Sequence, residues 1–280
     1  MIIIRTAKGL EEIRQKRQLT LQNSGFVPTM GALHNGHIAL LQQSRQENEF
    51  SVVSIFVNPT QFNNAEDFAR YPVTVEQDVA RLEAAGCDIL FLPEVEEIYP
   101  PAYQAPVYPL GNLENMLEGK FRPGHYQGVC QVVDRLLKIV KPGRLYLGLK
   151  DYQQCLVITK MIEVTGHEAK VRLCQTVRED DGLAKSSRNI RLSPEQRAIA
   201  PAISQALENI KENIISENLE QLIKLNIEML VGKGFNVDYL VIADAETLQS
   251  LNKLVPGRIA IALAAATIGN IRLIDNMALN

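Results

Sequence analysis

Two histidines stand three residues apart in the stretch VPTMGALHNGHIALLQQS, which spans residues 27–44. His34 and His37 are accompanied by Gly31 and Gly36, and an apolar helical run follows them. An imidazole N–H can donate a hydrogen bond to a phosphate oxygen, and glycine allows the backbone to approach a ligand closely. A helix that starts after a strand also favours an anion, because its N–H groups and its dipole point toward it. The stretch therefore predicts a phosphate-binding turn.

Other interpretations of these histidines are a metal site or an ordinary helix start. The stretch is neither a Walker A loop nor a GxGxxG fingerprint. A metal site would require a third ligand, and the remaining histidines, His125 and His167, belong to no HExxH motif. Two surface histidines beside a capping glycine are the plain structural alternative. We predict no metal site made of protein side chains, and we expect four buried, reduced thiols at Cys87, Cys130, Cys155 and Cys174.

The elements that must position the histidines alternate between short apolar strands and helical patterns. Strands are expected at residues 1–4, 25–29, 51–58, 87–93, 144–148 and 169–176, and helices at 9–18, 74–86, 127–143 and 151–166. This alternation predicts an α/β fold with a doubly wound parallel sheet. In such sheets ligands bind beyond the carboxyl ends of the strands, where the two histidines are expected to lie.

The pattern changes near residue 178. Residues 193–214 predict one helix, with Ser193 as N-cap, Pro194 at the first helical position and Gln196 completing a capping box. A second helix is expected over about 217–232, and strands over 237–244 and 257–279. We therefore predict two domains, residues 1–177 and a smaller α+β domain of residues 178–280.

Composition limits the possible partners. The formal net charge is −3 and 46% of the residues are hydrophobic, which is ordinary for a globular protein and argues against a nucleic-acid or membrane-surface protein. The longest apolar stretch, residues 259–269, is shorter than the roughly 18 residues of a spanning helix. The amino-terminal stretch has no basic leader before its apolar part, so it is a poor signal peptide. We expect a cytoplasmic protein that binds neither nucleic acid nor membrane.

Six blocks of sequence carry a resemblance to a known family. HNGH at 34–37 resembles the His-x-Gly-His signature of the nucleotidyltransferase superfamily, and PTMGALHNGH at 28–37 resembles the pantothenate synthetase (pantoate–β-alanine ligase) family in particular. The other blocks, in order, are FVNPTQF (56–62), FRPGHYQGVC (121–130), KDYQQ (150–154), DGLAKSSRN (181–189) and RLIDN (272–276). The resemblance spans essentially the whole chain.

The resemblance implies a Rossmann-like nucleotide- and pantoate-binding domain. The change of pattern near residue 178 suggests that the C-terminal domain is a lid hinged near residues 178–190. The same resemblance implies an AMP-forming acid–amino-acid ligase of pantothenate and coenzyme A biosynthesis. Such an enzyme joins pantoate to β-alanine through a pantoyl-adenylate and releases AMP and pyrophosphate. ATP is then a substrate, Mg²⁺ arrives with the nucleotide, and the protein is expected to be a homodimer.

The resemblance also implies roles for individual residues. His34 and His37 would bind ATP phosphates, with His37 the principal donor to transition-state charge, and Lys150 would reach the α-phosphate. Ser186 to Arg188 would bind the departing pyrophosphate. The expected ATP-binding residues are Met30, Gly31, Ala32, Leu33, His34, Asn35, Gly36, His37, Gly148, Leu149, Lys150, Asp151, Val177, Lys185, Ser186, Ser187 and Arg188.

Pantoate and β-alanine are expected at Gln61, Gln154 and Asn58. Amides can donate to and accept from hydroxyl groups without repelling an acid. Without the resemblance, Asn-Pro is simply a turn signal. Arg122 and His125, in RPGH, either line the entrance to the site or stabilise a neighbouring loop.

Two positions depart from the family pattern, and two other functions share its signature. Leu149 stands where glutamate is common, and Lys185 where methionine or leucine is usual. The alternatives are a nucleotidyltransferase that keeps AMP attached to its product and a non-catalytic nucleotide-binding domain. VNPTQF and KDYQQ argue against the first, and the presence of His34, His37 and Lys150 argues against the second.

Overall fold

A computed structural model describes residues 1–16, 20–62, 68–69, 71–215 and 218–280. Within these residues the chain divides into two compact units. The first is Met1–Gly148 with Gln154–Gln175, and the second is Leu149–Gln153 with Thr176–Asn280. Residues 149–153 therefore group with the C-terminal part of the chain, although they precede the boundary that we predicted between residues 177 and 178. Residues 17, 18 and 217, which fall in expected helices, lie outside the described residues.

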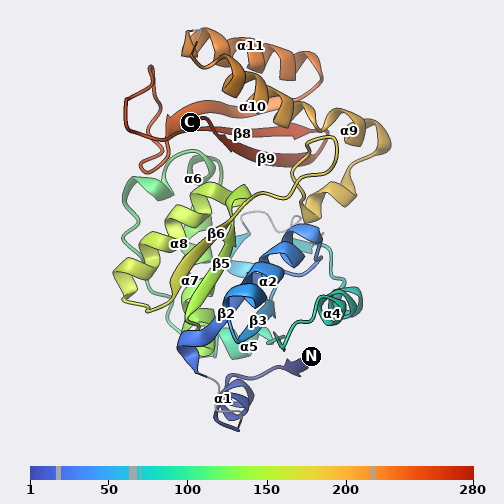
Figure 1. Ribbon diagram of the computed structural model, residues 1–280, viewed down its shortest axis with the longest axis vertical. Coiled ribbons are helices and arrows are strands. Elements are labelled where there is room, and N and C mark those ends of the chain that lie inside the picture. Colours follow the sequence, from blue (N-terminus) through green and yellow to red (C-terminus); the bar gives the residue numbers. More distant parts are fainter. Residues whose placement is uncertain (17–19, 63–67, 70, 216–217) are drawn as a thin grey trace. The chain divides into compact units, whose positions relative to one another are not determined.

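The described strands of the first unit form a six-stranded parallel sheet in the order β1-β4-β3-β2-β5-β6. This confirms the predicted α/β fold. Figure 1 labels β2, β3, β5 and β6 of this sheet. The chain proceeds to one side of β2 through β3 and β4, and to its other side through β5 and β6. The order thus reverses between β2 and β5, and ligands of doubly wound sheets bind at such a point. The strands are β1 (Ile2–Ile4), β2 (Ser24–Thr29), β3 (Phe50–Ile55), β4 (Ile89–Phe91), β5 (Arg144–Gly148) and β6 (Lys170–Cys174).

Helices cover both faces of this sheet. Phe26 and Val27 are consecutive in β2 and enter different cores, because successive side chains of a strand point to opposite faces. The core around Phe26 includes residues of α1, α7 and α8, and the core around Val27 includes residues of α2 and α4. The helices are α1 (Ala7–Lys16), α2 (Asn35–Glu47), α4 (Val75–Ala84), α5 (Val95–Ile98), α6 (Glu118–Phe121), α7 (His125–Val140) and α8 (Tyr152–Thr165), with short turns η1 (Leu21–Asn23), η2 (Pro59–Gln61) and η3 (Gly111–Glu114).

A buried carboxylate joins α7 to the segment before β6. Asp134 is fully buried, and its oxygens accept from His167 Nε2 at 2.7 Å, Lys138 Nζ at 2.7 Å and the Tyr108 hydroxyl at 2.9 Å. Burial by itself raises the pKa of this carboxyl, but the three donors outweigh burial and lower the pKa to about 2. Asp134 is therefore ionised at neutral pH and holds these elements together.

The second unit contains a three-stranded antiparallel sheet in the order β7-β8-β9, with α10 and α11 packed on it (Figure 1). Its described strands are β7 (Asn236–Asp244), β8 (Ala260–Ile268) and β9 (Ile271–Ala278). This confirms the expected smaller α+β part of the chain. Its helices and turns are η4 (Leu149–Asp151), η5 (Ser187–Arg191), α9 (Pro194–Ile199), α10 (Ala202–Asn213) and α11 (Leu219–Gly232).

The helix predicted over residues 193–214 is two helices, so that prediction was wrong in one respect. Its capping box is confirmed, since the Ser193 side chain accepts from the Gln196 N–H and the Gln196 side chain accepts from the Ser193 N–H. The break falls at Pro201, which lies between α9 and α10. Proline has no N–H to donate, and its ring crowds the preceding turn.

No described helix has the length and apolar character that crossing a membrane requires.

Candidate active site

The two histidines form a capping box at the start of α2. His34 is the N-cap, and its Nδ1 accepts the Gly36 N–H at 3.1 Å. His37 Nδ1 accepts the His34 N–H at 3.2 Å. The ring centroids are 4.1 Å apart, and the ring planes are inclined by 35°. The two imidazoles are therefore held side by side at the carboxyl end of β2, and both rings are partly exposed.

These hydrogen bonds determine where each ring carries its proton. A nitrogen that accepts a backbone N–H has no proton of its own, so Nδ1 is unprotonated in both rings. The neutral rings must then carry their proton on Nε2. The capping arrangement therefore makes Nε2–H the ring donor of both His34 and His37. An Nε2–H can donate a hydrogen bond to an anionic oxygen.

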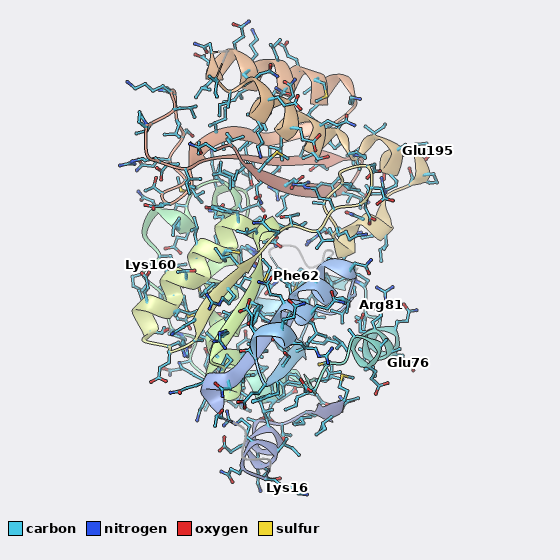
Figure 2. The ribbon with its side chains drawn as sticks, viewed as in Figure 1. Lys16, Phe62, Glu76, Arg81, Lys160 and Glu195 are labelled. Carbon is cyan, nitrogen blue, oxygen red and sulfur yellow. The ribbon has the colours of Figure 1, made fainter. Side chains whose placement is uncertain are left out.

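Helix α4 clamps the loop between β2 and α2. Asp78 Oδ2 accepts the Ala32 N–H at 2.9 Å and Asp78 Oδ1 accepts the Leu33 N–H at 2.7 Å. Arg81, labelled on α4 in Figure 2, donates from Nη1 to the Leu33 carbonyl. The loop needs this support because Gly31 and Ala32 have φ values of 81° and 48°, and the second is strained for a residue with a side chain.

The clamp also determines which atoms of this loop are available to a nucleotide. The N–H groups of Ala32 and Leu33, two expected ATP-binding residues, are bonded to Asp78, so a contact from either residue would use other atoms. The Gly31 N–H donates to Thr29 Oγ1 at 3.2 Å. These amides cannot form a phosphate nest like that of a P-loop. In this loop the imidazoles are the groups suited to grip phosphate.

A second cluster follows β3 in the same unit. Gln61, on η2, is largely buried and donates from Nε2 to Met30 Sδ at 2.9 Å. Asn58 Nδ2 donates to Gln61 Oε1 at 3.2 Å and to the Gly128 carbonyl at 3.1 Å. Asn58 Oδ1 accepts from the Tyr99 hydroxyl at 2.9 Å. The structure therefore brings together Met30 and Gln61, two of the predicted site residues.

Asn58 was predicted to bind substrate, and its geometry indicates a supporting position instead. Its side chain is fully buried, and both amide protons are donated to protein atoms. Its oxygen accepts the Thr60 N–H and hydroxyl as well as the Tyr99 hydroxyl. All donors of the Asn58 amide are therefore used within the protein, one of them on Gln61.

The RPGH segment contacts the same turn, as expected in the structural one of its two interpretations. His125 is buried, and its Nδ1 lies 2.8 Å from the Gln61 carbonyl oxygen, to which it must donate because a carbonyl only accepts. Arg122 Nη1 donates to His125 Nε2 at 3.1 Å. A Cβ on Gly128 would meet the Thr60 carbonyl at 2.5 Å, so glycine allows α7 to approach η2. Arg122 and His125 therefore stabilise the neighbouring loop.

Lys150 lies on η4, in the second unit. Its Nζ is 3.7 Å from Asp151 Oδ1, and its side chain is 19% exposed. The carbonyls of Leu149 and Lys150 each accept from Asn276 Nδ2 at 2.8 Å. Gln154, on α8, belongs to the first unit and is partly buried. Gly148 is the last residue of β5.

The predicted pyrophosphate loop also lies in the second unit. Ser186 is the N-cap of η5 and its Oγ accepts the Arg188 N–H at 3.3 Å. Lys185 Nζ forms an ion pair with Glu179, which offsets the extra charge of this departure from the family pattern. The Val177 carbonyl accepts the Lys185 N–H at 2.9 Å. Ser187 and Arg188 start η5 and are partly exposed.

Sequence reasoning missed Asp78, Arg81 and Asn276. One signal was available for Asp78, which lies between Val75, Val79 and Leu82 on the apolar stripe of α4. A charged residue at a buried helical position needs partners. No local pattern names those partners, because the contact to Ala32 joins residues 46 apart in the sequence.

The expectation of buried, reduced thiols is confirmed, since all four cysteines are free and buried. Burial raises the pKa of Cys87 and of Cys130 to about 12 and that of Cys174 to about 11. The thiols of Cys87, Cys130 and Cys174 are therefore protonated at neutral pH.

The chain is similar to known proteins along its whole length. A family model described as pantoate-beta-alanine ligase matches residues 2–278. A pantothenate synthetase of Thermus thermophilus is 45% identical over 277 residues, which cover 98% of this chain and 99% of that protein. The pantothenate synthetase of Acetivibrio thermocellus is 42% identical over 283 residues, which cover 99% of each protein.

Solved structures agree with the sequence comparison. A crystal structure of the Thermus thermophilus pantothenate synthetase matches with a TM-score of 0.93 at 43% identity, covering 100% of this chain and 99% of that one. A crystal structure of the Francisella tularensis pantoate-beta-alanine ligase, complexed with beta-gamma ATP and beta-alanine, has a TM-score of 0.83 at 39% identity and covers 100% and 98%. The resemblance carried by the six sequence blocks is confirmed: the chain belongs to the pantoate-beta-alanine ligase family.

Proposed function

We propose that this chain condenses pantoate with β-alanine at the expense of ATP, and that the capping imidazoles of α2 hold the triphosphate. The observation that carries the proposal is the pair of Nδ1 acceptors, which leaves Nε2–H as the donor of both His34 and His37. These donors lie beyond β2, where the strand order reverses. Family membership supports the overall reaction.

The first half-reaction activates a carboxylate. A pantoate carboxylate oxygen attacks the α-phosphorus of ATP, the bond from this phosphorus to the bridging oxygen breaks, and pyrophosphate leaves with its electron pair. The product is pantoyl-adenylate. Two anions must meet in this step, so fixed cationic and N–H donors are needed where charge develops. We assign this role to His37 and His34, with Lys150 at the α-phosphate and Ser186, Ser187 and Arg188 at the pyrophosphate.

Pantoate is proposed to bind through Gln61 and Gln154. The two amides can donate to and accept from its hydroxyls without adding negative charge. Asn58 and His125 hold Gln61 by its side chain and by its carbonyl, so the turn is set before the substrate arrives. Such preorganisation places the carboxylate for attack without further ordering of the turn.

The remaining nucleotide contacts are proposed along two short segments. The residues proposed to lie beside the nucleotide are Met30, Gly31, Ala32, Leu33, Asn35, Gly36, Gly148, Leu149 and Asp151. Val177 would contact the adenine through its backbone; its carbonyl already accepts the Lys185 N–H and retains one lone pair. Lys185 would contribute less charge than a free lysine, since it is paired with Glu179.

Mg²⁺ is proposed to arrive with ATP. The described residues contain no group of three or more His, Cys, Asp or Glu able to hold a metal ion. An ion that travels with a triphosphate takes most of its ligands from phosphate oxygens and water, so it fits this chain without a dedicated site. When bound, it would neutralise phosphate charge during the attack.

In the second half-reaction the β-alanine nitrogen attacks the acyl carbon, the bond to AMP breaks, and the amine loses its proton. The adenylate must be shielded from water until then. We propose that the second unit serves as a lid, because it carries Lys150 and Ser186 to Arg188 together. A crosslink that restrains this unit should abolish turnover, and full turnover of the crosslinked protein would contradict the lid.

We further propose that the protein acts as a cytoplasmic homodimer. In keeping with a dimer, Leu173 exposes 46% of its surface on β6, which is an edge strand of the described sheet. Apolar side chains on an edge strand are a common site of association. Sedimentation equilibrium would measure the state directly, and a monomer at micromolar concentration would contradict this proposal.

The reaction can be tested by exchange of labelled pyrophosphate into ATP. We expect exchange that requires pantoate but not β-alanine. Free AMP should form only when both pantoate and β-alanine are present. His37→Ala and Lys150→Ala should each reduce exchange about 10²- to 10³-fold. His167→Ala is the matched control, because this histidine is bonded to Asp134 and should affect stability alone. Exchange without pantoate, or undiminished exchange in His37→Ala, would contradict the proposal.

A further inference from the structure

The strand β9 carries two consecutive buried polar residues, Asp275 and Asn276. Most of β9 alternates buried and partly buried positions, and the alternation ends at this pair. A buried polar group is costly unless it is hydrogen-bonded, so both side chains need partners. They belong to the RLIDN block, to which the proposed function assigns no role.

Asn276 bonds to the turn that carries Lys150. Its Nδ2 donates to the Leu149 carbonyl and to the Lys150 carbonyl, both at 2.8 Å. One amide therefore uses both of its protons on consecutive carbonyls of η4. The contact spans 126 residues of sequence and lies entirely within the second unit. It fixes the backbone from which the Lys150 side chain extends.

An ion pair in turn holds Asn276. Arg178 Nη1 and Nη2 bond to the two carboxylate oxygens of Asp275 at 2.5 and 3.0 Å, and Nη2 also donates to the Asn276 carbonyl at 3.2 Å. The Asn276 N–H donates to Asp275 Oδ1 at 2.8 Å. A bidentate guanidinium–carboxylate pair has a defined geometry. Both ends of the Asn276 backbone are thereby restrained.

The same arginine reaches the hairpin that leads to Ser186. Arg178 Nη1 donates to the Gly182 carbonyl at 3.0 Å, and Arg178 pairs with Ala184 across the hairpin. Asp275 and Asn276 are thus connected to the two segments of the second unit that contain proposed ATP-binding residues. One strand supports both segments.

We propose that Asn276 is a positioning residue for Lys150, acting through the backbone of η4, with the Arg178–Asp275 pair holding Asn276 in place. This inference rests on the role proposed for Lys150. Asn276 itself contacts no substrate. A displacement of about 1 Å in a reacting group costs about 10²-fold in rate, so we expect Asn276→Ala to lower kcat for pyrophosphate exchange about 10- to 100-fold.

A double-mutant cycle separates positioning from general destabilisation. If Asn276 acts through Lys150, Asn276→Ala should change kcat less than about 2-fold in a Lys150→Ala background, because coupled residues are not additive. Asn226→Ala is the matched control: Asn226 is also buried in the same unit, and its Nδ2 also donates two hydrogen bonds, to Leu222 and Asn209. It should lower the unfolding temperature without lowering kcat.

The outcomes distinguish this inference from the proposed function. If Lys150→Ala is inactive while Asn276→Ala keeps wild-type kcat, the inference fails and the role of Lys150 stands. An equal loss in both backgrounds would also overturn the inference. Undiminished exchange in Lys150→Ala would refute the role of Lys150 and the inference with it. Should Asn276→Ala not fold, Asn276→Ser, which retains a hydroxyl donor in a smaller side chain, undergoes the same cycle with a smaller expected loss.

Discussion

Replacing Asp78 by asparagine tests whether α4 holds the histidine loop in its active shape. The carboxylate is 1% exposed and accepts from Ala32, Leu33 and the Thr74 hydroxyl. Asparagine keeps the volume but places an NH₂ group where one of these oxygens accepts. At least one buried backbone N–H then loses its acceptor, which costs about 1–3 kcal/mol. We expect the free energy of unfolding to fall by about 2 kcal/mol.

The same change should lower activity, because the loop leads directly into the capping histidines. Ala32 has a φ of 48° that its bond to Asp78 helps to maintain. Relaxation of the loop by about 1 Å would reduce pantoate-dependent pyrophosphate exchange up to about 10²-fold. Urea unfolding followed by circular dichroism measures the first effect, and labelled exchange measures the second.

Asp88→Asn is the control for this substitution. Asp88 Oδ2 accepts the Ser51 N–H at 2.8 Å, near the amino end of β3 and thus at the end of the strands opposite to the histidines. Asp88→Asn should reduce stability and leave exchange near wild type. If Asp78→Asn is destabilised but exchanges like Asp88→Asn, the clamp does not position the histidines and the reasoning is refuted.

Three further predictions follow from packing and ionisation. Gly128→Ala would place a Cβ 2.5 Å from the Thr60 carbonyl. We expect the free energy of unfolding to fall by about 1–3 kcal/mol and the KM for pantoate to rise. The control, Gly232→Ala, has no neighbouring atom within 4 Å and should be neutral in urea unfolding and in kinetics. The pKa of Asp134 is lowered from 3.8 to about 2; its contribution of about 2 kcal/mol is present above pH 4 and is lost as pH falls toward 2, a phase that Asp134→Asn should lack. Aromatic disulfide reagents at pH 7.5 should react rapidly only after unfolding with Cys87, Cys130, Cys155 and Cys174, and rapid native reaction would contradict their burial.

Local sequence pattern was enough for most elements of this fold. Apolar strands and amphipathic helices identify themselves by period, and the capping box at Ser193 placed a helix start correctly. The order β1-β4-β3-β2-β5-β6 depends on pairing between strands that are distant in the sequence, and the periodicity of apolar residues does not predict such pairing. The proline itself was a local signal for the break at residue 201. The apolar stripe continues across this position, and it led us to predict one helix.

The candidate site divides in the same way. His34 and His37 stood out because their type and their neighbouring glycines suit phosphate, whereas Gln61 was identified through the family resemblance. The residues that orient them did not, because Asp78 and His125 reach the loops from distant helices. The proton positions of the imidazoles also depend on backbone geometry, which only the folded chain provides.

Proton positions on the four histidines offer the most direct measurement of the central claim. Long-range ¹H–¹⁵N spectra of histidine-labelled protein report which nitrogen is protonated, with and without ATP and Mg²⁺. We predict Nε2–H on His34 and His37, and Nδ1–H on His125, which donates to the Gln61 carbonyl. ATP should shift the Nε2 signals of His34 and His37 and leave His125 unchanged. Nδ1–H on the two capping rings, or signals indifferent to ATP, would contradict the claim that these imidazoles grip the triphosphate.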